Sequence, residues 1–113
     1  MIKHRAEMRP EIKENLKGGN GALHFTHIFE PDELTKSRMF AVINLKPGDS
    51  IGPHPHHEDG EAYVVLDGSV TVTEDGTDYI LHAGDAEYCT GGHTHALLNH
   101  TDGPAAVLAV ILN

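Results

Sequence analysis

Short apolar runs, each followed by glycine, proline or aspartate, succeed one another along most of the chain. No run exceeds eight residues, and none shows the longer 3.6-residue period of an amphipathic helix. The strand candidates are residues 22–29, 38–45, 61–68, 69–74, 77–84, 86–90, 95–100 and 105–112. A series of short strands with Gly, Pro and Asp turns predicts an all-β domain, either a sandwich or a barrel.

The start of the chain has a different character. Residues 1–21 are charged and then glycine-rich at "KGGNG", which favours a short N-terminal arm with a helical turn. Residues 22–113 hold all the strand candidates, and a chain of 113 residues suits one compact domain with one core. We therefore expect an arm over 1–21 and a single β domain over 22–113.

Charge and composition exclude several classes of partner. The formal net charge of −9 argues against nucleic acid, which needs a basic face, and more weakly against an anionic membrane surface. No apolar run is long enough to span a bilayer, and the first residues lack the apolar middle of a secretory signal. The single cysteine, Cys89, excludes an intrachain disulfide. These features favour a soluble, cytoplasmic protein that binds neither nucleic acid nor membrane.

Histidines are concentrated in the stretch "PHPHHEDGE", residues 53–61. His54 and His56 are two residues apart, so in a strand both side chains point to the same face. The prolines beside them stiffen the backbone. Neutral imidazole binds metals near neutral pH. The stretch therefore suggests, without proving, a metal site.

Two spaced motifs run through residues 48–99. The first contains Gly48, His54, His56, Glu61 and Gly68, separated by five, one, four and six residues. The second contains Gly84, Thr90, Gly92, His95 and Asn99, separated by five, one, two and three residues. This pattern resembles the cupin family, whose motifs run G-x5-H-x-H-x3,4-E-x6-G and G-x5-P-x-G-x2-H-x3-N. The one departure is Thr90, which stands where the family usually has proline.

The resemblance implies a fold and a ligand set. The fold would be a small antiparallel jelly-roll β-barrel, and His54, His56, Glu61 and His95 would bind a metal in its mouth. Three imidazoles and one carboxylate cover one side of an octahedral metal and leave positions open for a ligand. A carboxylate without thiolate favours manganese or iron(II) as the divalent metal, although nickel, copper and zinc also suit these donors.

Other pocket residues are less strongly indicated. Tyr63 lies two residues after Glu61 on the same strand face, so it either lines the pocket or is a half-buried barrel tyrosine. Tyr88 is a weaker candidate of the same kind. Arg38 lies on the face of residues 38–45 opposite the more apolar one, which turns it outward. We therefore expect no arginine in the pocket.

The function implied by the resemblance stays open between two classes. Similar cupins include decarboxylases, dioxygenases and isomerases, and also binding modules without known chemistry. The chain is thus either a metal-dependent enzyme that transforms a small oxygenated acid, or a non-catalytic protein whose metal binds a small molecule or merely clamps the barrel. A carboxylate is one ligand that both classes allow. No catalytic residue is indicated. Exposed apolar positions at Phe40 and Val42, with the two-sided apolar run 105–112, favour a homodimer.

Overall fold

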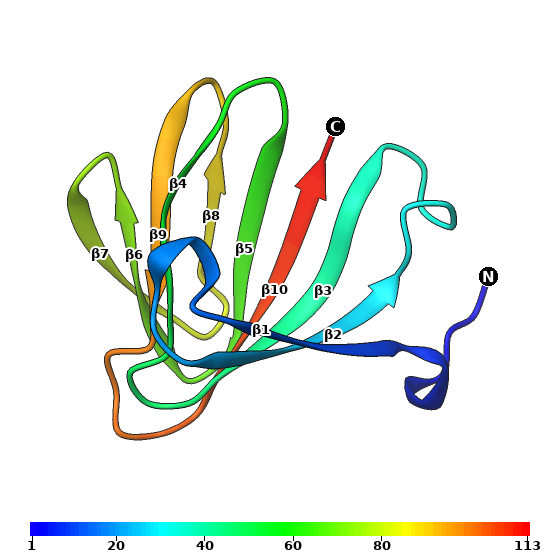
Figure 1. Ribbon diagram of the computed structural model, residues 1–113, viewed down its shortest axis with the longest axis horizontal. Helices are drawn as coiled ribbons and strands as arrows, with labels where there is room; N and C mark the ends of the chain where they lie inside the picture. Colours follow the sequence, from blue (N-terminus) through cyan, green and yellow to red (C-terminus); the bar gives the residue numbers. More distant parts are fainter.

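The computed structural model describes residues 1–113, which fold into two antiparallel β-sheets packed face to face (Figure 1). One sheet has six strands in the order β1-β2-β3-β10-β5-β8, and the other has four in the order β4-β9-β6-β7. The strands are β1 (Arg9–Glu14), β2 (Ala22–Phe29), β3 (Ser37–Leu45), β4 (Ser50–His56), β5 (Gly60–Asp67), β6 (Ser69–Glu74), β7 (Thr77–His82), β8 (Ala86–Cys89), β9 (His93–Leu98) and β10 (Ala105–Leu112). The all-β jelly-roll fold is confirmed. No helix in this structure has the length and apolar character needed to cross a membrane.

The core lies between the two sheets because alternate side chains of each strand turn inward. On β3 these are Ala41, Ile43 and Leu45, and on β10 they are Val107 and Ala109. The opposite face of β10 is only partly buried. In the single chain, this two-sided apolar strand is therefore buried mainly on its inner face.

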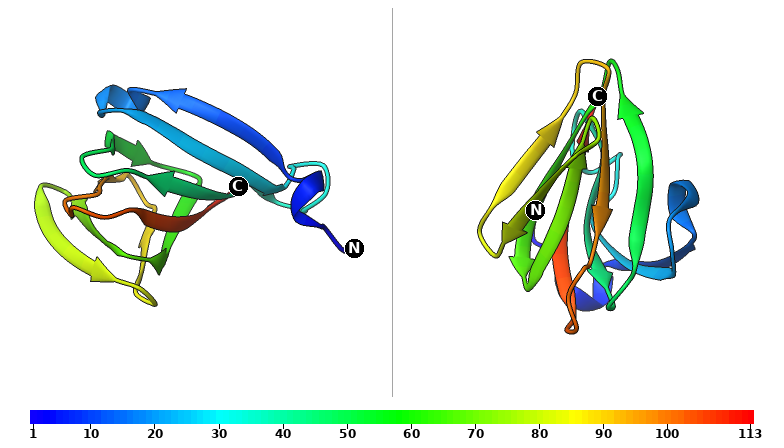
Figure 2. Two further views of the ribbon diagram at one scale, coloured as in Figure 1. Left: turned by 90° about the horizontal axis from the view of Figure 1, so that it is seen from below. Right: turned by 90° about the vertical axis from the view of Figure 1, so that its left-hand side faces the viewer.

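The N-terminal residues form a strand that the sequence did not indicate. β1 pairs with β2 from Arg9↔His27 to Glu14↔Ala22, at the edge of the six-stranded sheet. The expected helical turn is replaced by two 3-10 turns, η1 (Arg5–Glu7) and η2 (Leu16–Gly18). Figure 2 shows β1 and β2 running side by side along one flank of the molecule. Residues 9–14 of the arm are thus built into the sheet.

η2 returns from β1 to the barrel and lies against β4 (blue turn near the centre of Figure 1). The two backbones touch at glycines. A Cβ on Gly52 would overlap the carbonyl oxygen of Lys17, and one on Gly19 would overlap that of Ser50. The backbone N–H of Asn20 donates to the Ser50 hydroxyl at 2.8 Å. These contacts hold η2 next to the strand that carries two of the clustered histidines.

Candidate metal centre

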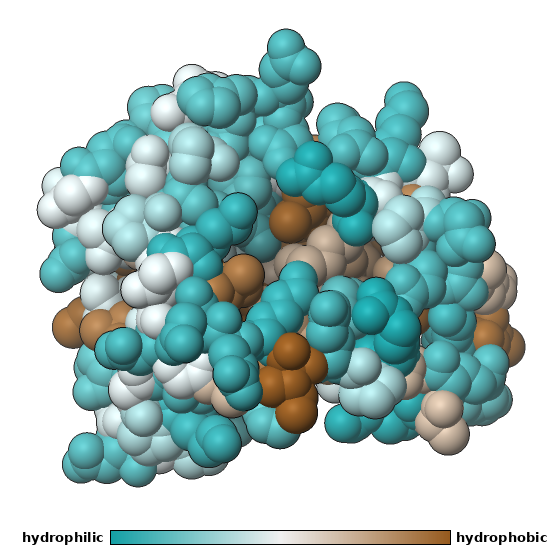
Figure 3. Space-filling model, viewed as in Figure 1, coloured by the Kyte–Doolittle hydropathy of each residue, from teal (hydrophilic) through white to brown (hydrophobic).

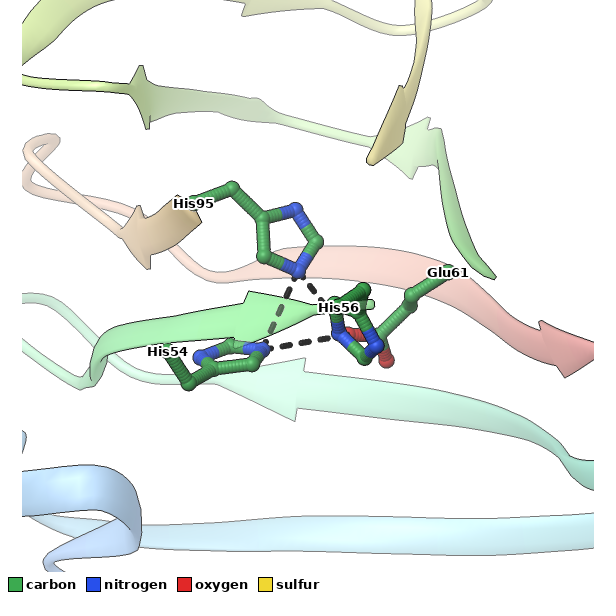
Figure 4. A group of neighbouring side chains, drawn as sticks. All are labelled: His54, His56, Glu61 and His95. Atoms are coloured by element: carbon green, nitrogen blue, oxygen red, sulfur yellow. Dashed lines mark hydrogen bonds and ion pairs between the residues drawn. The ribbon is translucent and has the colours of Figure 1, made fainter. Parts of the chain in front are cut away.

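Four side chains from three strands converge inside the barrel. His54 and His56 lie on β4, Glu61 lies at the start of β5, and His95 lies on β9 directly opposite His54. The Oε1 atom of Glu61 is 3.2, 3.1 and 3.0 Å from the Nε2 atoms of His54, His56 and His95, respectively. The Nε2 atoms of His95 and His54 are 3.0 Å apart. Figure 4 shows the three rings and the carboxylate pointing toward one another, and all four residues are buried.

This donor set fits a divalent transition metal. All four donor atoms lie within 4.8 Å of one another. Donors about 2.1 Å from a metal are separated by about 3.0 Å when they occupy neighbouring octahedral positions, and by about 3.4 Å in a tetrahedron. The four separations of 3.0–3.2 Å between these donors are in the range that a bound transition metal requires. Two imidazole nitrogens and a carboxylate oxygen in mutual contact also form a poor hydrogen-bond network, because nitrogen faces nitrogen.

Groups behind the rings orient them. The Nδ1–H of His54 donates to the carbonyl oxygen of Gly52 at 2.8 Å, and Nδ1 of His95 is 2.9 Å from Oε1 of Glu87. When Nδ1 carries the proton, Nε2 is left as the metal-binding nitrogen. The sequence analysis did not identify Glu87. Strand alternation on β8, which places it on the same face as the buried Cys89, was the available signal.

His56 is oriented through the loop that follows it. Its Nδ1 is 3.1 Å from Oδ1 of Asp59, although outside hydrogen-bond alignment. Arg38 forms an ion pair with Asp59, and the hydroxyl of Thr90 donates to the Asp59 carbonyl at 2.7 Å. Thr90, the residue that departs from the family pattern, therefore helps to hold the loop that follows His56 in place.

The electrostatics of the cluster favour a charged pair when no metal is bound. Burial raises the pKa of Glu61, but hydrogen bonds from His54 and His95 outweigh it and hold that pKa at about 2. Burial lowers the pKa of His95, but hydrogen bonds to Glu61 and Glu87 outweigh it and raise that pKa to about 9. The carboxylate is therefore present at neutral pH, as a metal ligand must be.

Tyr63 lies inside the barrel beside this cluster. It is fully buried, and its ring stacks on the His95 ring with centroids 4.6 Å apart. Its hydroxyl has no hydrogen-bond partner in the chain. Burial and the charge of Glu61 raise its pKa well above the usual value, so the hydroxyl is neutral and free to donate.

Tyr88 does not belong to this site. Its side chain is 54% exposed on the outer face of β8 and lines other hollows of the surface. The structure places Tyr88 away from the cavity above the cluster, because the alternation that turns its neighbours Glu87 and Cys89 inward turns Tyr88 outward.

A cavity of about 180 Å³ opens above the cluster. Figure 3 shows a hollow in this face of the molecule, with hydrophobic atoms inside and hydrophilic atoms around it. Lys13, Leu16 and Lys17 of the N-terminal segment form part of its wall, which the sequence analysis missed. Arg38 also reaches the rim, although its backbone position turns it outward, because its side chain is long enough to bend back to Asp59.

Comparison with known proteins places these features in a family. A family model described as a cupin domain matches residues 41–111. An oxalate-binding protein of Thermotoga maritima is 32% identical over 99% of this chain and 93% of its own length. A germin-like protein of Oryza sativa is 35% identical over 83% of this chain, but over only 44% of its own length. A solved structure from Thermotoga maritima, described as a predicted oxalate decarboxylase, superimposes with a TM-score of 0.93 over 99% of this chain and 98% of its own, at 32% identity.

Proposed function

Because the chain belongs to the cupin family, we propose that it binds a small carboxylate at a divalent metal held by His54, His56, Glu61 and His95. The observation that carries this proposal is the convergence of the four buried donors at the base of an open cavity. Four protein donors leave two positions of an octahedral metal for a ligand that chelates through two oxygens. We infer manganese or iron(II) as the metal, because the set combines imidazole with carboxylate and contains no thiolate.

The surroundings of the cavity support an anionic ligand. The chain has 17 acidic and only eight basic residues, yet Lys13, Lys17 and Arg38 all lie at this cavity. Lys17 has no acidic partner within ion-pair distance. Positive charge gathered at one opening of an acidic protein attracts small anions to that opening. The oxalate-binding relative is consistent with a carboxylate.

Transformation of the bound acid is a second candidate function. A bound metal of this kind supplies Lewis-acid or redox chemistry. On the protein side, the unpartnered Tyr63 hydroxyl favours this function, since it can donate a hydrogen bond to an oxygen held at the cluster. Against it, the two carboxylates at the cavity are already engaged. Glu61 contacts the three imidazoles, and Asp59 is paired with Arg38.

Metal analysis followed by titration tests the proposed function. Protein purified without a tag is analysed for metals and then titrated calorimetrically with oxalate and pyruvate, with and without prior chelation. We expect close to one divalent transition metal per chain and saturable binding of at least one acid that chelation abolishes. Acid binding that persists unchanged in metal-free protein would contradict the proposal. Assays for acid consumption and carbon dioxide release then separate the binding module from the enzyme.

We also propose that the protein is a homodimer. The outer face of the six-stranded sheet presents Phe40, Val42, Leu108 and Val110, all only partly buried in the single chain. Burial of such a face against a second copy removes apolar surface from water and gives a closed two-fold pair. Light scattering at micromolar concentration should give twice the chain mass of 12.2 kDa, and a monomer would refute the dimer.

A further inference from the structure

The strand register places an apolar strip directly beside the candidate metal ligand Glu61. Ile111 on β10 is paired with Glu61 on β5, and Met39 on β3 is paired with Ile111. Directly paired residues of an antiparallel sheet point to the same face, and adjacent strands are about 4.8 Å apart. The inner face of the sheet therefore runs from a carboxylate ligand to two aliphatic side chains within about 10 Å.

Both aliphatic side chains are accessible from the cavity. Met39 and Ile111 line it and are only partly buried. Behind them, the cavity also contacts Phe25, Ile43 and Ile51, which belong to the buried core. Apolar atoms at the wall of a binding cavity stay in contact with water unless a ligand covers them.

The N-terminal segment supplies further lining to the same cavity. Leu16 lines it and packs against the core. Lys13 also lines it, with its Nζ 4.6 Å from the centre of the Phe25 ring, so that its aliphatic stem and charge are held there. The cavity thus combines a metal-binding end with apolar lining and positive charge, all within one small volume.

From this arrangement we infer that the ligand is a small 2-oxo or 2-hydroxy monocarboxylic acid with a short aliphatic chain. This inference rests on the proposed function and names the ligand class of the same site. One carboxylate oxygen and the oxygen on carbon 2 would bind the metal held by the four donors, and the aliphatic chain would lie over Ile111 and Met39. Oxalate carries no apolar atom beyond its two carboxyl groups, so it would leave this strip uncovered.

The size of the cavity limits the aliphatic chain. Its volume of about 180 Å³ is well below the roughly 300–1,000 Å³ of sites for drug-sized ligands. Each buried methylene strengthens binding by about fourfold, which follows from its transfer free energy. The gain therefore continues for a few carbons and stops when the cavity is full.

A homologous series of acids tests the inference on the unmodified protein. Metal-loaded protein is titrated by calorimetry with oxalate, pyruvate, 2-oxobutyrate and 2-oxovalerate. We expect the affinity to rise about fourfold per added methylene along the 2-oxo acids, and 2-oxobutyrate to bind more tightly than oxalate. Equal affinities along the series, or tightest binding of oxalate, would overturn the inference and leave the proposed function standing. Failure of every acid to bind would overturn both.

Two matched variants at Met39 test whether the gain in affinity along the series comes from the apolar strip. Met39→Gln exchanges an apolar side chain for a polar one of similar length, whereas Met39→Leu keeps it apolar. Met39→Gln should lose most of the gain in affinity from pyruvate to 2-oxovalerate, whatever its affinity for pyruvate itself, and Met39→Leu should keep that gain. Metal content, measured in parallel, should equal that of the wild type in both. A full gain in the Gln variant with intact metal would show that the aliphatic chain lies elsewhere.

Discussion

Tyr63, which stacks on His95 beside the four candidate metal ligands, gives a prediction in which the stability of the fold and the affinity for a bound acid change in opposite directions. Tyr63→Phe removes one hydroxyl from a fully buried position and keeps the ring that stacks on His95. In the metal-free protein that hydroxyl has lost its hydrogen bonds to water and has gained none from the chain. Its removal should therefore stabilise the metal-free fold.

The size of the gain follows from the desolvation of an unsatisfied hydroxyl. Such a group costs about 1–3 kcal/mol when it is buried without a partner. For a domain of 113 residues, each kcal/mol corresponds to roughly 4 °C in the thermal midpoint. We expect metal-free Tyr63→Phe to unfold about 4 °C or more above metal-free wild type.

Urea unfolding and calorimetry of chelated protein measure the gain in stability. Titration of metal-loaded protein with pyruvate measures the change in ligand affinity. If the hydroxyl donates to a bound acid, the same variant should bind pyruvate several-fold more weakly, since one hydrogen bond is worth about 1 kcal/mol. Tyr63→Leu is the control, because it loses both the stack and the ring volume and should be destabilised by about 2 kcal/mol or more. Destabilisation of metal-free Tyr63→Phe by 1 kcal/mol or more would refute the reasoning, because it would show that the hydroxyl has a partner in the fold.

Three further predictions concern the cluster itself. His56→Ala should lose most of the bound metal, and full metal retention in this variant would contradict the site assignment. Chelation of the wild type should lower the thermal midpoint by several degrees, because metal stabilises only the folded chain. An unchanged midpoint after verified metal removal would contradict the same assignment. In metal-free protein, the raised pKa of His95, about 9, and the lowered pKa of Glu61, about 2, make their pair stabilising. That stability is fully present between the ordinary values of 4.5 and 6.5, fades as the pH rises from 6.5 through 9, and is lost as the pH falls from 4.5 through 2. Urea midpoints measured across this range should therefore peak near pH 5–6, and a midpoint that rises steadily up to pH 9 would contradict it. Glu87→Gln should weaken metal binding about 10–100-fold in a chelator competition and shift the tautomer of His95 seen by ¹⁵N NMR, whereas an unchanged tautomer would remove Glu87 from its orienting role.

Much of the fold and the cluster could be predicted from the sequence because both depend on short-range patterns. Turn residues and strand alternation act over a few positions, so eight of the ten strands were among the candidates, and β1 and β4 were not. The spacing of His54, His56, Glu61 and His95 singled out the same four residues that the structure brings together. Alternation also separates His27, which is buried, from the exposed His24 three positions away.

The missed features depend on contacts between segments far apart in the chain. Residues 9–14 carry only one aliphatic side chain, Ile12, and become a strand because β2 offers its edge. Lys13 and Lys17 are ordinary surface lysines in the sequence. The pairing of β1 with β2 brings Lys13 to the cavity, and the contact of η2 with β4 brings Lys17 there. The position of Arg38 also escaped prediction, since backbone alternation does not say where a long flexible side chain ends.

The site has two parts that can change independently, and they meet where the backbone of η2 contacts the backbone of β4. Every donor atom of the cluster belongs to residues 41–111, the range shared with the family, whereas Lys13, Leu16, Lys17 and Met39 precede it. Substitutions before residue 41 can therefore reshape the room available to a ligand while the donors stay in place. Over evolutionary time, a lineage of such chains could change the ligand that fits the cavity by varying residues before position 41, with the four donor residues unchanged.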